Sequence, residues 1–476
     1  MHTLGNFRFK KINSDYLLTN DVGEYAFIPP QDFNNLASGC LNDISLKETA
    51  ILEEKGFINL SAASLRLENK YRSKNSFLGM GTSLHIIVST LRCDHKCVYC
   101  HASAQGSEGK ATDMDRQTAK AVVDCIFESP SKAITIEFQG GEPLLNFEIL
   151  KFVTEYANDK NKAAGKDLLI AVVTNLSPLN DEILKFLIKN KISICTSIDG
   201  PHNLHNKNRF SFCGDSHAKV VKSFKRLQKA YLNRIKYRPN ALVTITRESL
   251  RYPKEIIKEY IKLNLDSIHL RPLNPFGFAI KQQKTIGYTA DEFLSFYRKS
   301  LDYILKINSK GKVFYERTAR IFLSKIFNDD DPGYFELRSP CGAGIGQMAY
   351  NYNGDVYTCD EGRMVGRLGD DAFRLGNVRE DNYNALIGKE ALKAVCTSSL
   401  LDILPGCSNC VYKPYCGVCP IYNYVTSGTL FAQAPNNDRC KINTGILDYL
   451  FDKLRVDKNK KIFKAWLLAH HGSKTV

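Results

Sequence analysis

The chain has little tryptophan and methionine and no long apolar run. Of 476 residues, one is Trp and five are Met. No apolar stretch approaches the roughly 20 residues that a membrane-spanning helix needs. The first 20 residues place Lys10, Lys11 and Asp15 among apolar residues, whereas a secretory signal carries its charges ahead of an apolar core. There is no internal repeat and no low-complexity segment. These absences favour a cytoplasmic protein with no membrane partner.

The rest of the composition is that of a folded protein. Hydrophobic residues make up 43% and charged residues 24%, which excludes disordered and collagen-like chains. The length allows about three domains at roughly 150 residues each. Lys and Arg exceed Asp and Glu, 65 against 50, giving a net charge of +15. Such an excess favours an anionic partner, but it does not choose between nucleic acid, a membrane surface and an acidic peptide.

Cysteine is abundant, with 15 residues. Thiols stay reduced in the cytoplasm, so disulfides are a poor explanation for so many. Metal binding or catalysis is the better expectation.

Residues 83–330 predict an α/β fold. Short β-branched runs alternate with helical patterns, which predicts parallel strands with crossover helices, as in an α/β barrel or an open sheet. Such folds place their chemistry at the C-terminal ends of the strands. The expected strands are 84–89, 133–138, 168–173, 192–198, 242–245 and 267–270, and the expected helices include 113–128, 148–160, 182–189, 217–231 and 254–263.

Three further regions flank this core. Residues 1–82 predict a small α+β module, with short strands at 7–9, 16–19 and 25–28 and a helix that Ser45 and Glu48 begin with a capping box. Residues 331–445 are rich in Gly, Tyr, Asn and Cys and show little periodicity, so we expect an irregular domain held by metal. Residues 446–476 predict a C-terminal helix followed by a basic tail.

The first cysteine motif follows the first predicted strand. Cys93, Cys97 and Cys100 form a C-x3-C-x2-C loop. Three thiolates can hold three irons of a four-iron cluster and leave the fourth open for chemistry. A zinc site completed by His95 or His101 is the alternative for this motif taken alone.

A second motif follows the second predicted strand. Gly140, Gly141, Glu142 and Pro143 stand directly after it. Two glycines let the backbone approach a ligand closely, and a carboxylate beyond them can pair with an ammonium group. Alone this is a common turn, but its position one strand after the cysteine loop makes a ligand site the better interpretation.

Together these two motifs resemble the radical S-adenosylmethionine (SAM) superfamily. The resemblance implies a partial (β/α)6 barrel, a catalytic [4Fe–4S] cluster on the three cysteines, and SAM cleavage to a 5′-deoxyadenosyl radical. It implies Tyr99 beside the adenine and Glu142 on the methionyl ammonium. Asp199 could instead form an Asx turn and Arg209 a surface charge. The implied SAM contacts are Tyr99, Gly140, Gly141, Glu142, Pro143, Thr174, Asn175, Ser197, Asp199 and Arg209.

The C-terminal cysteines resemble the SPASM extension of radical SAM peptide-modifying enzymes. That resemblance implies two auxiliary [4Fe–4S] clusters, one on Cys341, Cys359 and Cys419, the other on Cys407, Cys410, Cys416 and Cys440. The Cys416–Cys419 interval is shorter by one residue than is usual, and a cysteine upstream of Cys341 is missing. The first auxiliary cluster then has an open iron or borrows a ligand, such as Cys396 or the substrate.

Asp360 directly follows Cys359. A related sulfatase-maturing group has its catalytic base at this position, which makes Asp360 the candidate catalytic residue. The alternative is a carboxylate that accepts N–H groups and orients the cluster loop.

Over its full length the chain is most similar to the B-type radical SAM maturases of His-Xaa-Ser peptide systems. The similarity implies oxidation of a ribosomally made precursor peptide with His-Xaa-Ser repeats, by crosslinking or desaturation, and a companion radical SAM maturase of C type. Flavodoxin or ferredoxin is the expected electron donor, and no nucleic acid is expected. Residues 1–82 either bind a leader peptide or simply pack on the barrel. Formylglycine formation in a sulfatase and a zinc-stapled nucleic-acid adaptor are the competing functions.

Overall fold

A nine-stranded sheet forms the centre of the computed structural model, which describes residues 3–212, 214–233 and 237–469. The strand order is β12-β10-β8-β7-β6-β4-β14-β15-β16. The pairs from β12 to β14 are parallel, and the last two pairs are antiparallel. The strands are β4 (Leu84–Val88), β6 (Ala133–Gln139), β7 (Asp167–Val173), β8 (Ser193–Ser197), β10 (Asn240–Thr244), β12 (Leu270–Arg271), β14 (Gln347–Tyr350), β15 (Asp355–Tyr357) and β16 (Arg374–Asn377).

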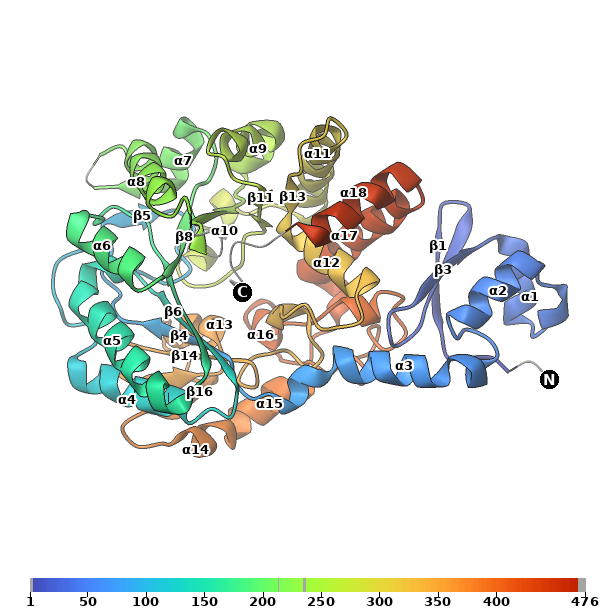
Figure 1. Ribbon diagram of the computed structural model, residues 1–476, viewed down its shortest axis with the longest axis horizontal. Helices are drawn as coiled ribbons and strands as arrows, with labels where there is room; N and C mark the ends of the chain where they lie inside the picture. The colour runs from blue at the N-terminus through green and yellow to red at the C-terminus, as the bar shows by residue number, and fades with distance from the viewer. Residues whose placement is uncertain (1–2, 213, 234–236, 470–476) are drawn as a thin grey trace.

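Helices follow the parallel strands and cover the outer face of the curved sheet (Figure 1). Asp115, Asn180 and Asp215 each accept a backbone N–H at a helix start, which satisfies an otherwise unpaired donor. The helices of this layer are α4 (Arg116–Phe127), α5 (Phe147–Ala164), α6 (Asp181–Lys189), α7 (His202–Asn208), α8 (Ser216–Ala230), α9 (Pro253–Lys262), α11 (Ala290–Asn308) and α12 (Arg317–Phe327). Helix α10 (Ala279–Ile286) instead packs on Tyr99 of the first cysteine motif. The predicted α/β class with a parallel strand–helix core is confirmed.

Two predictions about elements were wrong. The expected strand 267–270 is divided: β11 (Ser267–Ile268) pairs with β13 (Tyr315–Glu316), and only β12 joins the main sheet. The region 331–445 is less irregular than expected, because β14, β15 and β16 extend the sheet. Its helices are α13 (Asp360–Gly366), α14 (Tyr383–Ile387), α15 (Glu390–Ser398) and α16 (Pro420–Ser427).

The N-terminal segment folds as a small antiparallel sheet with three helices. Strands β1 (Arg8–Ile12), β2 (Asp15–Thr19) and β3 (Tyr25–Ile28) pair in that order. They are followed by α1 (Pro30–Ala37), α2 (Leu46–Glu54) and α3 (Leu60–Lys74). Ser45 caps α2 by accepting the N–H of Glu48, but the predicted capping box is incomplete, because Ser45 N donates to Asp32 Oδ1 at 3.1 Å instead of to Glu48.

The chain ends in two helices that pack against α11 and α12 (Figure 1). They are α17 (Asp438–Leu454) and α18 (Asp457–Leu468), so the expected basic tail begins as a helix. Two short strands, β5 (His95–Cys97) and β9 (Arg209–Ser211), pair beside the main sheet. Among the described residues, no helix has the length and apolar character to cross a membrane.

Candidate active site

A cavity of about 280 Å³ opens at the C-terminal ends of the parallel strands. Its wall includes all three cysteines of the first motif, and seven of the ten residues predicted to contact SAM. These seven are Tyr99, Gly140, Gly141, Thr174, Asn175, Ser197 and Arg209. Parallel strands bring these residues together because their carboxyl ends meet at one edge. We call this cavity the barrel chamber.

Backbone N–H groups surround the thiols of the first cysteine loop. His95 N donates to Cys93 Sγ and Ala104 N to Cys100 Sγ, each at 3.4 Å. Such bonds stabilise sulfur that carries negative charge. Burial raises the pKa of Cys97 to about 12 and that of Cys93 still further. The buried thiols therefore stay protonated until a metal displaces their protons.

Asp94 fixes the cysteine loop to the third strand's end. Its carboxylate accepts a hydrogen bond from Asn175 Nδ2 at 2.8 Å and another from Ser177 Oγ. Burial alone would raise the pKa of Asp94, but hydrogen bonds from His95 and Ser177 outweigh it and keep the pKa well below the usual range. Asp94 is thus an ionised anchor beside the loop.

The two glycines of the second motif pack against the cysteine loop. A Cβ at Gly141 would lie 2.2 Å from the carbonyl oxygen of Arg92, and one at Gly140 2.6 Å from that of Thr90. Gly140 also has a φ of +121°, which disfavours other residues. Gly141 N donates to Thr90 O at 3.0 Å. The motif therefore positions the loop as well as lining the chamber.

Three of the predicted SAM contacts do not line the chamber. Glu142 is fully buried, and its carboxylate accepts hydrogen bonds from Leu144 N, Thr174 Oγ1 and Asn175 N at 2.6–3.0 Å. Pro143 follows it in the turn, away from the chamber wall. Their roles as ligand contacts stay predictions, because in this structure the Glu142 carboxylate ties two strand ends together.

Asp199 is the third of these residues. It is fully buried, and both its oxygens accept the hydroxyl of Tyr99, at 2.9 and 2.7 Å. Arg209 in turn donates to Tyr99 Oη at 3.0 Å. Asp199 thus holds the ring of Tyr99 through its hydroxyl and orients a residue of the chamber wall.

Cys341, Cys359 and Cys419 lie in one buried cluster. Cys359 and Cys419 cap α13 and α16, and each thiol accepts a backbone N–H at 3.4 Å, from Gly362 and Tyr422 respectively. Helix N-termini stabilise anionic sulfur. Burial raises the pKa of Cys341 and Cys359, and the neighbouring thiol of Cys419 raises both further. The predicted grouping of these three cysteines agrees with their placement.

No additional cysteine joins this trio among the described residues. Cys396 packs against the main core instead, and burial alone raises its pKa. The acidic neighbours are Glu336 and Glu361, whose negative charges raise the pKa of the buried Cys341 further. A fourth cysteine ligand is therefore not at hand, and the open coordination site stays a prediction.

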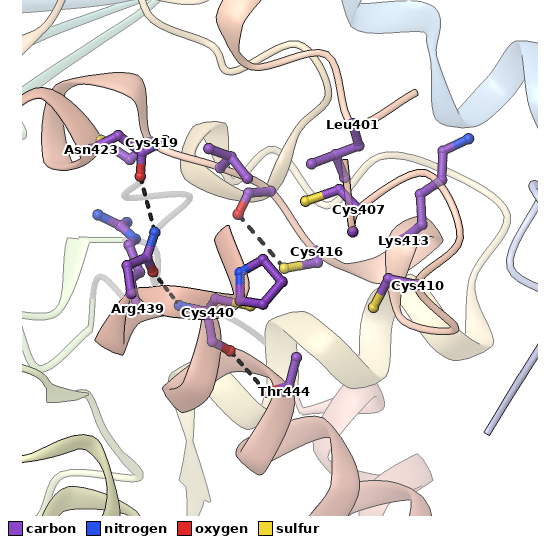
Figure 2. A pocket seen from close by; sticks show the side chains of 15 residues that line it. Leu401, Cys407, Cys410, Lys413, Cys416, Cys419, Asn423, Arg439, Cys440 and Thr444 are labelled. Carbon is purple, nitrogen blue, oxygen red and sulfur yellow. Dashed lines mark hydrogen bonds between the residues drawn. The ribbon is translucent and has the colours of Figure 1, made fainter. Parts of the chain in front are cut away.

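The other four C-terminal cysteines surround a second cavity. Figure 2 shows Cys407, Cys410, Cys416 and Cys440 around it, with Cys419 on the far side beside Asn423. Burial raises the pKa of Cys440 to about 12, and the other three thiols contribute to that rise. The four sulfurs therefore lie close enough to interact, as the predicted second auxiliary cluster requires.

The cysteine groups are spaced too widely for a single zinc ion. Zn–S bonds of about 2.3 Å place tetrahedral thiolates about 3.8 Å apart. In the part of the chain that the structure describes, only Cys93, Asp94 and His95 bring three such ligand atoms within 4.8 Å of one another. Cys97 and Cys100 are not part of that group, so it does not unite the three cysteines of the motif. A cluster of several irons fits the wider spacing better than zinc does.

Asp360 lies in the chamber wall but is already paired. Its Oδ1 accepts the Nε of Arg363 at 2.7 Å, and the two side chains are 8% and 1% exposed. Of the two roles left open for Asp360, orientation of the cluster loop agrees better with this ion pair than proton transfer does. Its role as catalytic base stays an untested prediction.

The chamber also contains residues that the sequence reasoning missed. Glu137 and Gln139 of β6 and Cys195 of β8 line it, and so does His101, which the sequence suggested only as a possible zinc ligand. The Nε2 of His101 is buried and has no hydrogen-bond partner among the residues that the structure describes. A charged residue within a predicted buried strand was the available signal for Glu137, because such strands are normally apolar on both faces.

Comparison with known proteins defines the class to which this fold and site belong. Residues 87–257 match the family model of the Radical SAM superfamily. This part of the chain is a radical SAM domain, for which SAM and a [4Fe–4S] cluster are the implied cofactors.

One relative by sequence and two solved structures are similar to most of the chain. The cysteine-type anaerobic sulfatase-maturating enzyme of Clostridium novyi is 24% identical over 345 residues, covering 70% of this chain and 86% of its own. The solved structure of native anSMEcpe with bound AdoMet has a TM-score of 0.68 at 20% identity, covering 80% of this chain and all of that one. Streptococcus suis SuiB bound to its precursor peptide SuiA has a TM-score of 0.55 at 14% identity, covering 90% and 98%.

Proposed function

We propose that this radical SAM enzyme oxidatively modifies a ribosomally made precursor peptide. The observation that carries the proposal is the barrel chamber, whose wall includes the first cysteine loop, seven predicted SAM contacts and three residues of the helix capped by Cys359. A substrate in this chamber would contact both the cysteine loop and that helix. Hydrogen abstraction followed by loss of an electron is the reaction that such an arrangement favours.

Different residues of the chain would bind the clusters and position the cysteine loop. Cys93, Cys97 and Cys100 would hold the catalytic [4Fe–4S] cluster, and SAM bound there supplies the 5′-deoxyadenosyl radical. Asp94 fixes the loop through Asn175 and Ser177. The C-terminal cysteine groups would hold two auxiliary clusters as electron acceptors.

A peptide substrate is supported by the relatives. SuiB is solved with a precursor peptide, and anSMEcpe with the peptide Cp18Cys. For this chain we propose a precursor with His-Xaa-Ser repeats, a companion radical SAM maturase of C type, and flavodoxin or ferredoxin as electron donor. The N-terminal sheet and helices, residues 1–82, would bind the leader segment by adding it as a strand.

Co-expression with a His-Xaa-Ser precursor tests this proposal. Mass spectrometry of the recovered peptide should find a loss of two hydrogens, which a crosslink or a desaturation produces. The matched control is the same co-expression with the Cys93→Ala/Cys97→Ala/Cys100→Ala variant, which should leave the peptide mass unchanged. An unmodified peptide in both arms would contradict the proposed substrate.

Formylglycine formation in a sulfatase is the second candidate. It is favoured by the match to the C. novyi sulfatase-maturating enzyme, which extends over 70% of this chain. The ion pair of Asp360 with Arg363 counts against it, because that function would need Asp360 as a free base. Incubation with a cysteine-containing sulfatase peptide distinguishes the two candidate functions. Conversion of cysteine to formylglycine removes the sulfur and adds an oxygen, so the peptide mass falls by more than the loss of two hydrogens.

A further inference from the structure

Glu137 is an acidic side chain inside the barrel chamber with no assigned role. It lies near the end of β6, where Ile136 and Phe138 pack into the core on the opposite face of the strand. Because side chains alternate along a strand, Glu137 and Gln139 face the chamber instead. The carboxyl group is therefore directed at the space that a substrate would enter.

The hydrogen bonding of Glu137 leaves most of its carboxylate available. Gln139 Nε2 donates to Oε1 at 2.6 Å, and the side chain is buried, with 7% of the residue exposed. By contrast, Asp360 is held by Arg363, and Glu142 accepts three hydrogen bonds. Glu336 and Glu361 also line the chamber, but Glu336 is paired with Arg439 and Glu361 lies beside Arg271, whereas Glu137 has an oxygen left to accept a proton.

Burial and the surrounding charges set the pKa of the Glu137 carboxyl group. Burial raises the pKa of Glu137 to about 7, the hydrogen bond from Gln139 opposes the rise, and the negative charge of Asp360 adds to it. Arg317 and Arg271 face the group from α12 and β12 and lower its pKa. The thiol of Cys195 on β8 also lies close enough to interact. A general base works best when its pKa is near the working pH.

We propose that Glu137 is the general base that takes a proton from the substrate in the barrel chamber. This inference rests on the proposed function. The substrate first loses a hydrogen atom from C–H to the 5′-deoxyadenosyl group. It then loses a proton from an X–H group to Glu137 and an electron to an iron–sulfur acceptor. The C–H and X–H bonds break, a bond between carbon and X forms, and the substrate is oxidised by two electrons.

Glu137→Gln tests the assignment with little disturbance, because the amide oxygen can still accept the bond from Gln139. With a synthetic peptide carrying His-Xaa-Ser repeats as the probe, we expect the oxidised product to fall at least 100-fold, while 5′-deoxyadenosine still forms. Glu137→Asp should recover part of the product. Glu148→Gln, exposed at the start of α5, is the matched control and should behave as wild type. Equal product from Glu137→Gln and wild type would overturn the assignment and leave the proposed function standing.

A second measurement needs no substrate. Infrared difference spectra of the anaerobic holoenzyme, recorded over pH 5–9, should contain a carboxyl band that titrates with a midpoint near pH 7. Burial also raises the pKa of Glu142 to about 7, so the band should lose intensity in Glu137→Gln without vanishing, and it should keep its full intensity in Glu148→Gln. If the band has the same intensity in Glu137→Gln as in the wild type, or if the wild type has none, the assignment is wrong whatever the peptide substrate proves to be.

Discussion

At the scale of single residues, the site is built from close backbone approaches. Gly141 has the carbonyl oxygen of Arg92 2.2 Å from where a Cβ would be, so the second motif can lie against the cysteine loop only with glycine there. Glu142 N then donates to that same carbonyl at 2.7 Å. The two motifs recognised separately in the sequence are therefore one unit in the structure.

This packing predicts that Gly141→Ala displaces the loop that carries Cys93. The added methyl group would overlap backbone atoms, which cannot move aside as a flexible side chain can. We expect reconstituted protein to lose about four of its irons per chain, the content of one [4Fe–4S] cluster, and SAM cleavage to fall at least tenfold. Gly106→Ala is the control, because no atom of the described part of the chain lies within 4 Å of the new Cβ apart from its chain neighbours. Wild-type iron content and activity in Gly141→Ala would contradict this account.

Some residues of the site could be predicted from the sequence, and others could not. Spacing grouped Cys93 with Cys97 and Cys100, because residues close in sequence on one loop must be close in space. Glu137 belongs to no motif, and its position depends on which face of β6 meets the chamber. Only the assembled sheet determines that.

At the scale of elements, local pattern located the parallel strands well. The structure has β4 at Leu84–Val88 and β6 at Ala133–Gln139, within a residue of the predicted ranges. Continuous apolar runs between helices give buried parallel strands a strong signal. The strand β14 had no such signal, because it has four residues and is defined by its pairing with β4, more than 250 positions earlier. A pairing at that distance in sequence is a tertiary effect.

The helix α18 was not predicted, because the many lysines of its segment indicated a basic tail. Its Trp466 is fully buried, donates Nε1–H to Asn308 Oδ1 at 3.0 Å and packs on Phe463. Trp466→Ala should reduce the free energy of unfolding by about 3–5 kcal/mol, the usual cost of emptying a large aromatic site. Urea unfolding followed by circular dichroism measures this. Leu468→Ala, at a position 81% exposed, should change stability by less than about 0.5 kcal/mol.

At the scale of the whole molecule, an aromatic junction connects three distant segments. Phe451 of α17 packs on Tyr25 of β3 and stacks on Tyr412 of the loop that carries Cys410 and Cys416. Thr19 Oγ1 of β2 also donates to the carbonyl of Val411 in this loop at 2.6 Å. The N-terminal sheet therefore rests on the segment that would hold the second auxiliary cluster.

This junction predicts that the cysteine loop and the N-terminal sheet lose order together. Cys410→Ser should weaken the second auxiliary cluster and speed amide hydrogen exchange in β2 and β3 at least tenfold, a change of about 1.4 kcal/mol in local opening. Cys40→Ser, at an exposed thiol, is the control. Exchange in β2 and β3 that is unchanged in a variant with less iron would show that the two parts are independent.

Production of 5′-deoxyadenosine is the most direct test of the central claim that Cys93, Cys97 and Cys100 hold the cluster that cleaves SAM. Anaerobically reconstituted protein is incubated with SAM and dithionite, and the nucleoside is quantified by mass spectrometry. The wild type should form it, whereas Cys93→Ala/Cys97→Ala/Cys100→Ala should form none and still retain the iron of the auxiliary clusters. Continued formation of 5′-deoxyadenosine by the triple variant would contradict the account.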